Sequence, residues 1–214
     1  YTYLRDADYV SGAAIAIPRD LFARLGGFDA RYAPAYYEDT DLAFKVRAAG
    51  RRVLYQPASV VVHDEGTTSG TDLGTGPKAA QVRNQAVFAE TWRHALTAQL
   101  PAGSVPSPAL LHRQQRQVLV IDALTPQPDR DSGSLRLVNL MRLLIEEGAH
   151  VMFVPANRSA DGGYTQALQA LGVECWHAPT MPRFPAWLRE HGHRFDVAMV
   201  SRHYIASEML PLLR

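Results

Sequence analysis

An unbroken apolar run, Val118–Ile121, most constrains what this chain can fold into. Such a run is typical of an interior strand of a parallel sheet, which is buried on both faces. Strand and helix patterns then alternate to the end of the chain. Strands are predicted over Val151–Val154, Val173–Trp176 and Val197–Val200, and helices over Leu135–Glu147, Tyr164–Leu171, Pro185–His191 and from Ile205 onward. This alternation predicts an α/β fold with a parallel sheet covered on both faces.

A proline-rich segment divides the chain before that sheet. Residues 101–108 contain three prolines separated by small residues, a composition typical of a semi-extended linker. The sequence therefore predicts a first domain over residues 1–100, a linker over 101–116, and a second domain over 117–214. From the patterns at its two ends, we expect the chain to be a fragment that is cut within a domain at each end.

The first domain carries shorter strand signals. Strands are predicted over Ala13–Ile17, Arg51–Tyr55 and Ala58–Val62, the last leading directly into His63. A helix is predicted from Leu42, because apolar residues recur there at helical spacing and Gly50 is placed to end it.

Composition excludes several classes of protein. The 214 residues are 47% hydrophobic and 20% charged, as in an ordinary globular protein. Their formal net charge of +1 implies no field that would attract nucleic acid. A lone cysteine, Cys175, excludes an internal disulfide and a cysteine-based zinc site. No apolar run approaches the ~20 residues that span a bilayer.

Three acids, Glu38, Asp39 and Asp41, crowd the start of the helix predicted from Leu42. Unpaired N–H groups and the helix dipole favour ionised carboxylates at a helix N-terminus. An ionised carboxylate that faces a cleft is a ready general base, but by pattern alone acids in a first turn are more often structural caps than catalytic groups. Nearby tyrosines leave a similar choice, because Tyr32, Tyr36 and Tyr37 suit either a sugar site or the anchoring of a loop.

The order of motifs around these acids resembles the C-terminal half of the catalytic domain of inverting family 2 glycosyltransferases, which have a GT-A fold. Upstream of the acids lie Asp8–Arg19 and Leu25–Asp29, and downstream lie Gly50–Val53 and Val60–His63. The resemblance covers about residues 1–95. It implies that a nucleotide-binding half with a DxD metal motif precedes Tyr1, so we expect this fragment alone to show little or no transferase activity.

The resemblance implies roles for individual residues. Asp39 would be the catalytic base that accepts the proton of an acceptor hydroxyl. Glu38 and Asp41 would position the acceptor or the helix terminus, while Ser11 and Gly12 would bring backbone close to the sugar.

The resemblance also implies a cofactor and substrates. His63 would help to bind a divalent metal, Mg or Mn, that neutralises the departing diphosphate. The partners would be a nucleotide-sugar donor and a glycan or lipid-linked glycan acceptor, in the assembly of a bacterial surface polysaccharide. We expect a cytoplasmic location, with attachment to the inner face of the membrane as an alternative.

The second domain is similar to the N-terminal, Rossmann-like half of GT-B glycosyltransferases of the family 4 type. The similarity lies in Asp131–Ser134, before a predicted helix, and in Gly148–Val151 after it. In that family this half mainly contacts the acceptor substrate. The loop before the helix has one glycine, Gly133, where a dinucleotide fingerprint needs three, so NAD binding is not indicated. Arg202-His203 follows the last predicted strand, where ligands of parallel sheets gather.

Two other function classes stay open from the residues alone. One is a non-catalytic carbohydrate-binding or scaffold module within a larger assembly. The other is a Rossmann-type enzyme that modifies nucleotide sugars, such as a dehydrogenase or epimerase, although the missing glycines count against it.

Overall fold

The computed structural model describes residues 2–62, 77–100, 112, 114–179 and 183–213. Its chain divides into an N-terminal unit, Arg5–Ser104, and a C-terminal unit, Val105–Arg214 together with Tyr1–Leu4. Residues 2–4 belong with the second unit because the Leu4 N–H donates to the Gln169 carbonyl at 2.9 Å and the Tyr3 hydroxyl lies 2.7 Å from His112 Nε2. The sequence pattern places these residues in the first domain instead.

The C-terminal unit is an α/β sandwich around one sheet. Its elements are β3 (Gln117–Asp122), α6 (Ser132–Glu146), β4 (His150–Pro155), α7 (Gly162–Leu171), β5 (Glu174–Cys175), α8 (Phe184–His191), η2 (Gly192–Arg194), β6 (Val197–Val200), α9 (His203–Met209) and η3 (Leu210–Leu212). The four strands are parallel and lie in the order β5-β4-β3-β6. The α/β class and the parallel sheet predicted from the alternation are confirmed.

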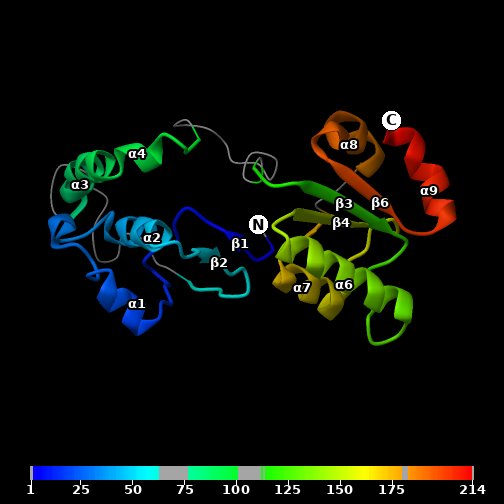
Figure 1. Ribbon diagram of the computed structural model, residues 1–214, viewed down its shortest axis with the longest axis horizontal. Helices are drawn as coiled ribbons and strands as arrows, with labels where there is room; N and C mark the ends of the chain where they lie inside the picture. Colours follow the sequence, from blue (N-terminus) through cyan, green and yellow to red (C-terminus); the bar gives the residue numbers. More distant parts are fainter. Residues whose placement is uncertain (1, 63–76, 101–111, 113, 180–182, 214) are drawn as a thin grey trace. The chain divides into compact units, whose positions relative to one another are not determined.

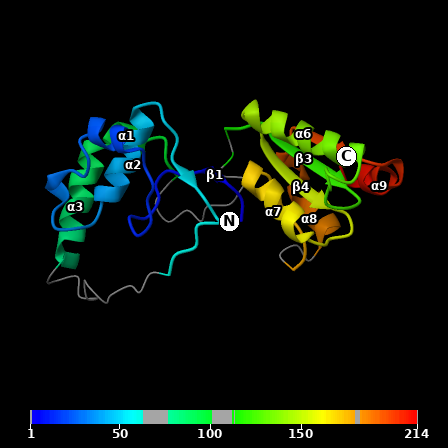
Figure 2. The same cartoon turned by 90° about the horizontal axis from the view of Figure 1, so that it is seen from below.

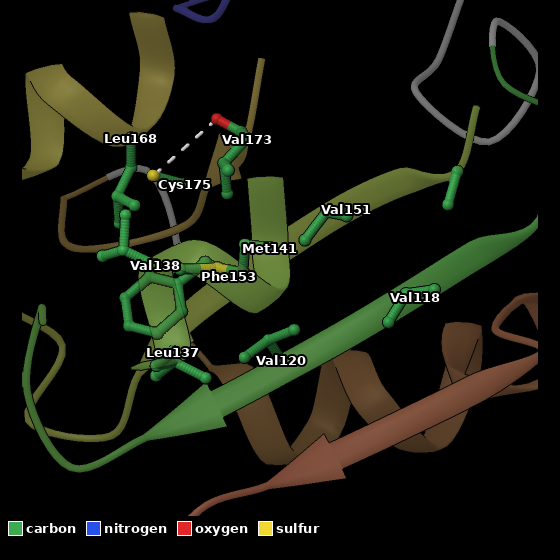
Figure 3. Close-up of a cluster of buried hydrophobic side chains, with 11 residues drawn as sticks. Val118, Val120, Leu137, Val138, Met141, Val151, Phe153, Leu168, Val173 and Cys175 are labelled. Carbon is green, nitrogen blue, oxygen red and sulfur yellow. Dashed lines mark hydrogen bonds between the residues drawn. The ribbon is translucent and has the colours of Figure 1, made fainter. Parts of the chain in front are cut away.

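Helices cover both faces of this sheet (Figure 1). On one face, Leu137, Val138 and Met141 of α6 pack against Val120 of β3 and Phe153 of β4, as Figure 3 shows. On the other face, Leu119 and Ile121 of β3 pack among residues of α8 and α9. Alternate residues of β3 therefore enter two different cores, which is why that strand is apolar throughout.

Local signals fix the ends of α6. The Asp131 carboxylate accepts hydrogen bonds from the Ser134 N–H and hydroxyl, both at 2.7 Å, and so caps the first turn. Past the other end, Gly148 adopts a left-handed φ of 83°, which lets the chain leave the helix and enter β4.

The N-terminal unit is mainly helical. Its elements are β1 (Arg5–Asp6), α1 (Arg19–Arg24), η1 (Ala30–Tyr32), α2 (Glu38–Ala48), β2 (Leu54–Tyr55), α3 (Pro77–Thr91) and α4 (Arg93–Leu96). α2 and α3 lie side by side (Figure 2), and the rings of Phe44 and Phe88 meet between them with centroids 5.0 Å apart. In the stretches that the structure describes, no helix is long and apolar enough to cross a membrane.

Two strand predictions for this unit are wrong, and a third is only partly right. Residues 13–17 and 58–62 form no strand, and of 51–55 only Leu54–Tyr55 does, paired antiparallel with β1. An extended segment becomes a strand only when a neighbour pairs with its backbone groups, and no described segment pairs with 13–17 or 58–62. The side chains of Val60 and Val62 are correspondingly 84% and 88% exposed.

The α6 face of the sheet should dominate the stability of the C-terminal unit. Met141 is fully buried among β3, β4 and α6, so Met141→Ala should lower the free energy of unfolding by about 2–5 kcal/mol. Leu143, two residues along α6, is 57% exposed, and Leu143→Ala should change that energy by no more than about 0.5 kcal/mol. Urea denaturation of the two variants tests this; equal losses would contradict the packing.

Candidate functional site

The chain turns sharply just before α2. Tyr36 and Tyr37 both have left-handed backbones, with φ of 74° and 75°, a conformation that residues other than glycine rarely adopt. α2 then begins at Glu38, so Glu38, Asp39 and Asp41 all lie in its first turn. Their side chains have three different environments.

Asp39 is held by backbone N–H groups from two segments. Its Oδ2 accepts from the Gly12 N–H at 2.7 Å, and its Oδ1 accepts from the Thr40 N–H at 2.7 Å and the Thr40 hydroxyl at 3.2 Å. The fold thus brings together two predicted site residues that are 27 positions apart. A Cβ atom on residue 12 would lie 3.1 Å from Asp39 Oδ2, so the close approach favours glycine.

A cavity of about 200 Å³ lies beside Asp39. It is lined by residues 15–18, by the apolar side of α2 and by residues 52–54, and most of that lining is aliphatic. The Asp39 carboxylate therefore lies at the edge of an apolar hollow, where a reacting group would be partly shielded from water.

Ser11 lies next to Gly12, but its side chain makes a hydrogen bond within its own turn. Its exposed hydroxyl oxygen accepts from the Ala13 N–H at 3.3 Å, which stabilises the turn that presents Gly12. Ser11 is thus beside the site, and its hydroxyl has no described bond to Asp39.

Asp41 has no exposed surface. Its Oδ1 accepts from the Trp92 indole N–H at 2.8 Å and from the Tyr32 hydroxyl at 3.3 Å, and its Oδ2 pairs with the Lys45 ammonium at 2.8 Å. These partners favour the second of its two predicted roles, that of holding the helix terminus. The hydrogen bond to Asp41 makes Tyr32 a buried anchor of the loop before α2. The ring of Tyr37 packs against that of Phe88, with ring centroids 5.4 Å apart.

Glu38 is half-buried, and its Oε2 is buried with no hydrogen-bond partner among the described residues. A carboxylate oxygen that is buried without a partner costs free energy. Of the three acids, Asp39 is the one that lines the cavity.

Sequence reasoning missed three residues that build this site. Asn84 of α3 and Trp92, the residue after α3, each lie four positions from Phe88, so all three face the same side. A polar residue in register with an apolar face was the signal that could have identified Asn84. Lys45 could have been found from its i,i+4 spacing to Asp41.

The predicted metal ligand, His63, lies outside the described residues. Within the described part of the chain, no three His, Cys, Asp or Glu side chains cluster as a metal site requires. Asp39 is engaged by N–H groups and Asp41 by Lys45, so the described acids alone do not form a donor set for Mg or Mn.

Arg202 marks the carboxyl edge of the other unit's sheet. Its backbone has a φ of 70°, and its Nε–H donates to Asp122 Oδ1 at 2.8 Å, joining the ends of β6 and β3. The hydrogen bond to Asp122 raises the pKa of Arg202. Helices leave these two neighbouring strands toward opposite faces, and in such sheets a ligand crevice opens at that point.

Comparison with known proteins gives a partial match. No family model and no solved structure matches the chain. Two proteins of Mycobacterium tuberculosis, from strains CDC 1551 / Oshkosh and ATCC 25618 / H37Rv, are 35% identical to it over 68 residues. Each is described as an N-acetylglucosaminyl-diphospho-decaprenol L-rhamnosyltransferase. The match spans 32% of this chain and 22% of each relative's length, and it supports a glycosyltransferase-like role.

The buried phenol of Tyr32 should make stability fall at alkaline pH. Burial, and then the neighbouring Asp41 carboxylate, raise the pKa of Tyr32 to about 12, above the value of about 10 expected in the unfolded chain. The folded state therefore keeps a proton that the unfolded state releases, so this stabilisation is complete below pH 10 and is lost between pH 10 and 12. Urea denaturation should show a steeper loss across that range for the wild type than for Tyr32→Phe. Parallel pH profiles would contradict this environment for Tyr32.

Proposed function

We propose that the N-terminal unit is part of the catalytic domain of an inverting glycosyltransferase, with Asp39 as its general base. The observation that carries the proposal is the placement of the Asp39 carboxylate, fixed by the Gly12 and Thr40 N–H groups at the edge of a cavity. The similarity over 68 residues to two rhamnosyltransferases supports the same class of chemistry.

In the proposed reaction, an acceptor hydroxyl lies against Asp39. Its oxygen attacks the anomeric carbon of a nucleotide sugar from the face opposite the leaving group. The new C–O bond forms while the bond to the nucleoside diphosphate breaks, which inverts the anomeric configuration. The hydroxyl proton passes to Asp39, and the electron pair of the broken bond leaves with the diphosphate.

The surrounding residues take supporting roles in this proposal. Glu38 helps to position the acceptor from the first residue of α2, and Asp41 holds the start of that helix. Ser11 and Gly12 form the turn that faces Asp39. Mg or Mn, with His63 among its ligands, would stabilise the diphosphate charge when bound. No step above depends on that ion.

The wider context is also part of the proposal. The chain would be a piece of a longer, bifunctional protein, with the C-terminal unit acting as the acceptor-side half of a GT-B glycosyltransferase. Its substrates would be a nucleotide-sugar donor and a glycan or lipid-linked glycan acceptor of a bacterial surface polysaccharide. The reaction would take place in the cytoplasm or at the inner membrane face.

Replacing the proposed base tests the chemistry directly. In the intact protein that carries this chain, Asp39→Asn should lower kcat by about 10²–10⁴-fold while the affinity for nucleotide sugar stays the same, because the amide cannot accept the proton. Asp20→Asn is the matched control, because Asp20 is exposed on α1 and pairs only with Arg24 within the described part of the chain. Steady-state transfer kinetics and donor titrations make the comparison, and an unchanged kcat would remove Asp39 as the base.

A titration of the intact protein with UDP- and dTDP-sugars, with and without metal, separates a transferase from a scaffold. Metal-dependent donor binding supports the proposed function. Carbohydrate binding with no affinity for any nucleotide sugar would favour a non-catalytic module instead.

A further inference from the structure

The left-handed dipeptide before α2 requires an explanation. Tyr36 and Tyr37 are adjacent, neither is glycine, and both have positive φ. Such a backbone costs free energy and persists only where surrounding contacts hold it, often next to a functional group. Asp39 lies two residues beyond Tyr37.

The contact that holds this dipeptide comes from α3. Asn84 is fully buried, and its Nδ2 donates to the carbonyl oxygens of Tyr32, Ala35 and Tyr36 at 2.7, 2.9 and 3.0 Å. Two amide hydrogens are thus shared among three carbonyls, one from the last residue of η1 and two from the loop between η1 and α2. The third of these carbonyls belongs to the first left-handed residue.

The same loop determines where α2 starts. The Asp41 N–H donates to the Tyr37 carbonyl at 2.8 Å, so the first described hydrogen bond of the helix begins at the second left-handed residue. The backbone directions at Tyr36 and Tyr37 therefore fix the orientation of the first turn, and with it the direction of the Asp39 carboxylate. The 2.7 Å bond from the Gly12 N–H to Asp39 depends on that direction.

A second anchor fixes the inner side of the turn. Trp92, eight residues after Asn84, donates its indole N–H to Asp41. This bond ties the buried side of α2. The loop before α2 is bound by the Arg83 guanidinium at the Ala33 carbonyl and by the Asn84 amide, and of these two side chains Asn84 is the one that bonds the carbonyl of a left-handed residue among the described contacts.

We propose that Asn84 is a positioning residue, which acts through the Tyr36–Tyr37 backbone to aim the Asp39 carboxylate at the Gly12 turn. A catalytic consequence of this orientation rests on the proposed function, whereas the orientation of the Asp39 carboxylate is a property of the fold. A purely structural Asn84 would contribute to stability alone and would leave the Asp39–Gly12 bond intact in any variant that still folds.

The Gly12 amide proton reports on the orientation of the Asp39 carboxylate. A short hydrogen bond to a carboxylate should shift this proton downfield and slow its exchange with solvent. In ¹H–¹⁵N spectra of the full 214-residue chain, Asn84→Ala should move the Gly12 resonance upfield and speed its exchange at least tenfold. Gln85→Ala is the matched control, because Gln85 is the next residue of α3 and is exposed, and it should leave Gly12 as in the wild type.

Asn84→Ser supplies a second variant if Asn84→Ala fails to fold. Serine keeps one donor of smaller reach, so its effect on Gly12 should have the same sign and a smaller size. A Gly12 resonance that is unchanged in a folded Asn84 variant would overturn the proposal.

Kinetics of the intact protein give an independent readout. Asn84→Ala should lower kcat at least tenfold with little change in the donor KM, because the base is misaligned while the donor site is untouched. A rise in donor KM with unchanged kcat would count against positioning. If the wild-type protein transfers no sugar, the proposed function fails, and the Gly12 resonance still decides the role of Asn84.

Discussion

The buried carboxylate of Asp41 is the interaction on which the N-terminal unit depends most. A charge removed from water is tolerated only when it is paired and hydrogen-bonded, and Asp41 meets that condition through Trp92, Tyr32 and Lys45. Each partner comes from a different place along the chain, so one side chain joins η1, α2 and the residue after α3. These contacts tie the acidic start of α2 to η1 and to the residue after α3.

The division of roles between Asp39 and Asp41 follows from helix geometry. Residues two positions apart lie on opposite sides of an α-helix, so when Asp41 faces the core, Asp39 must face away from it. On that side Asp39 accepts from the Gly12 N–H and lines a cavity, and it has no cationic partner among the described residues. Neutral donors therefore hold the Asp39 carboxylate, and its proposed role as a base rests on this arrangement.

The C-terminal unit shows how far a sequence can specify a fold. Its strands, their parallel direction and the helices on both faces were predictable, because apolar runs and helical spacing report burial directly. The pairing of Asp122 with Arg202 was not, since it joins residues 80 positions apart that meet only when β3 and β6 become neighbours.

By itself, the sequence determined the parallel α/β architecture of the second unit and the crowding of acids at one helix N-terminus. Both follow from local periodicity and capping, which a single stretch of chain encodes. Only the tertiary structure decided which acid is buried, which one meets Gly12, and that residues 13–17 and 58–62 form no strand. Those outcomes depend on partners distant in sequence, because burial, strand pairing and side-chain contacts are properties of two segments together.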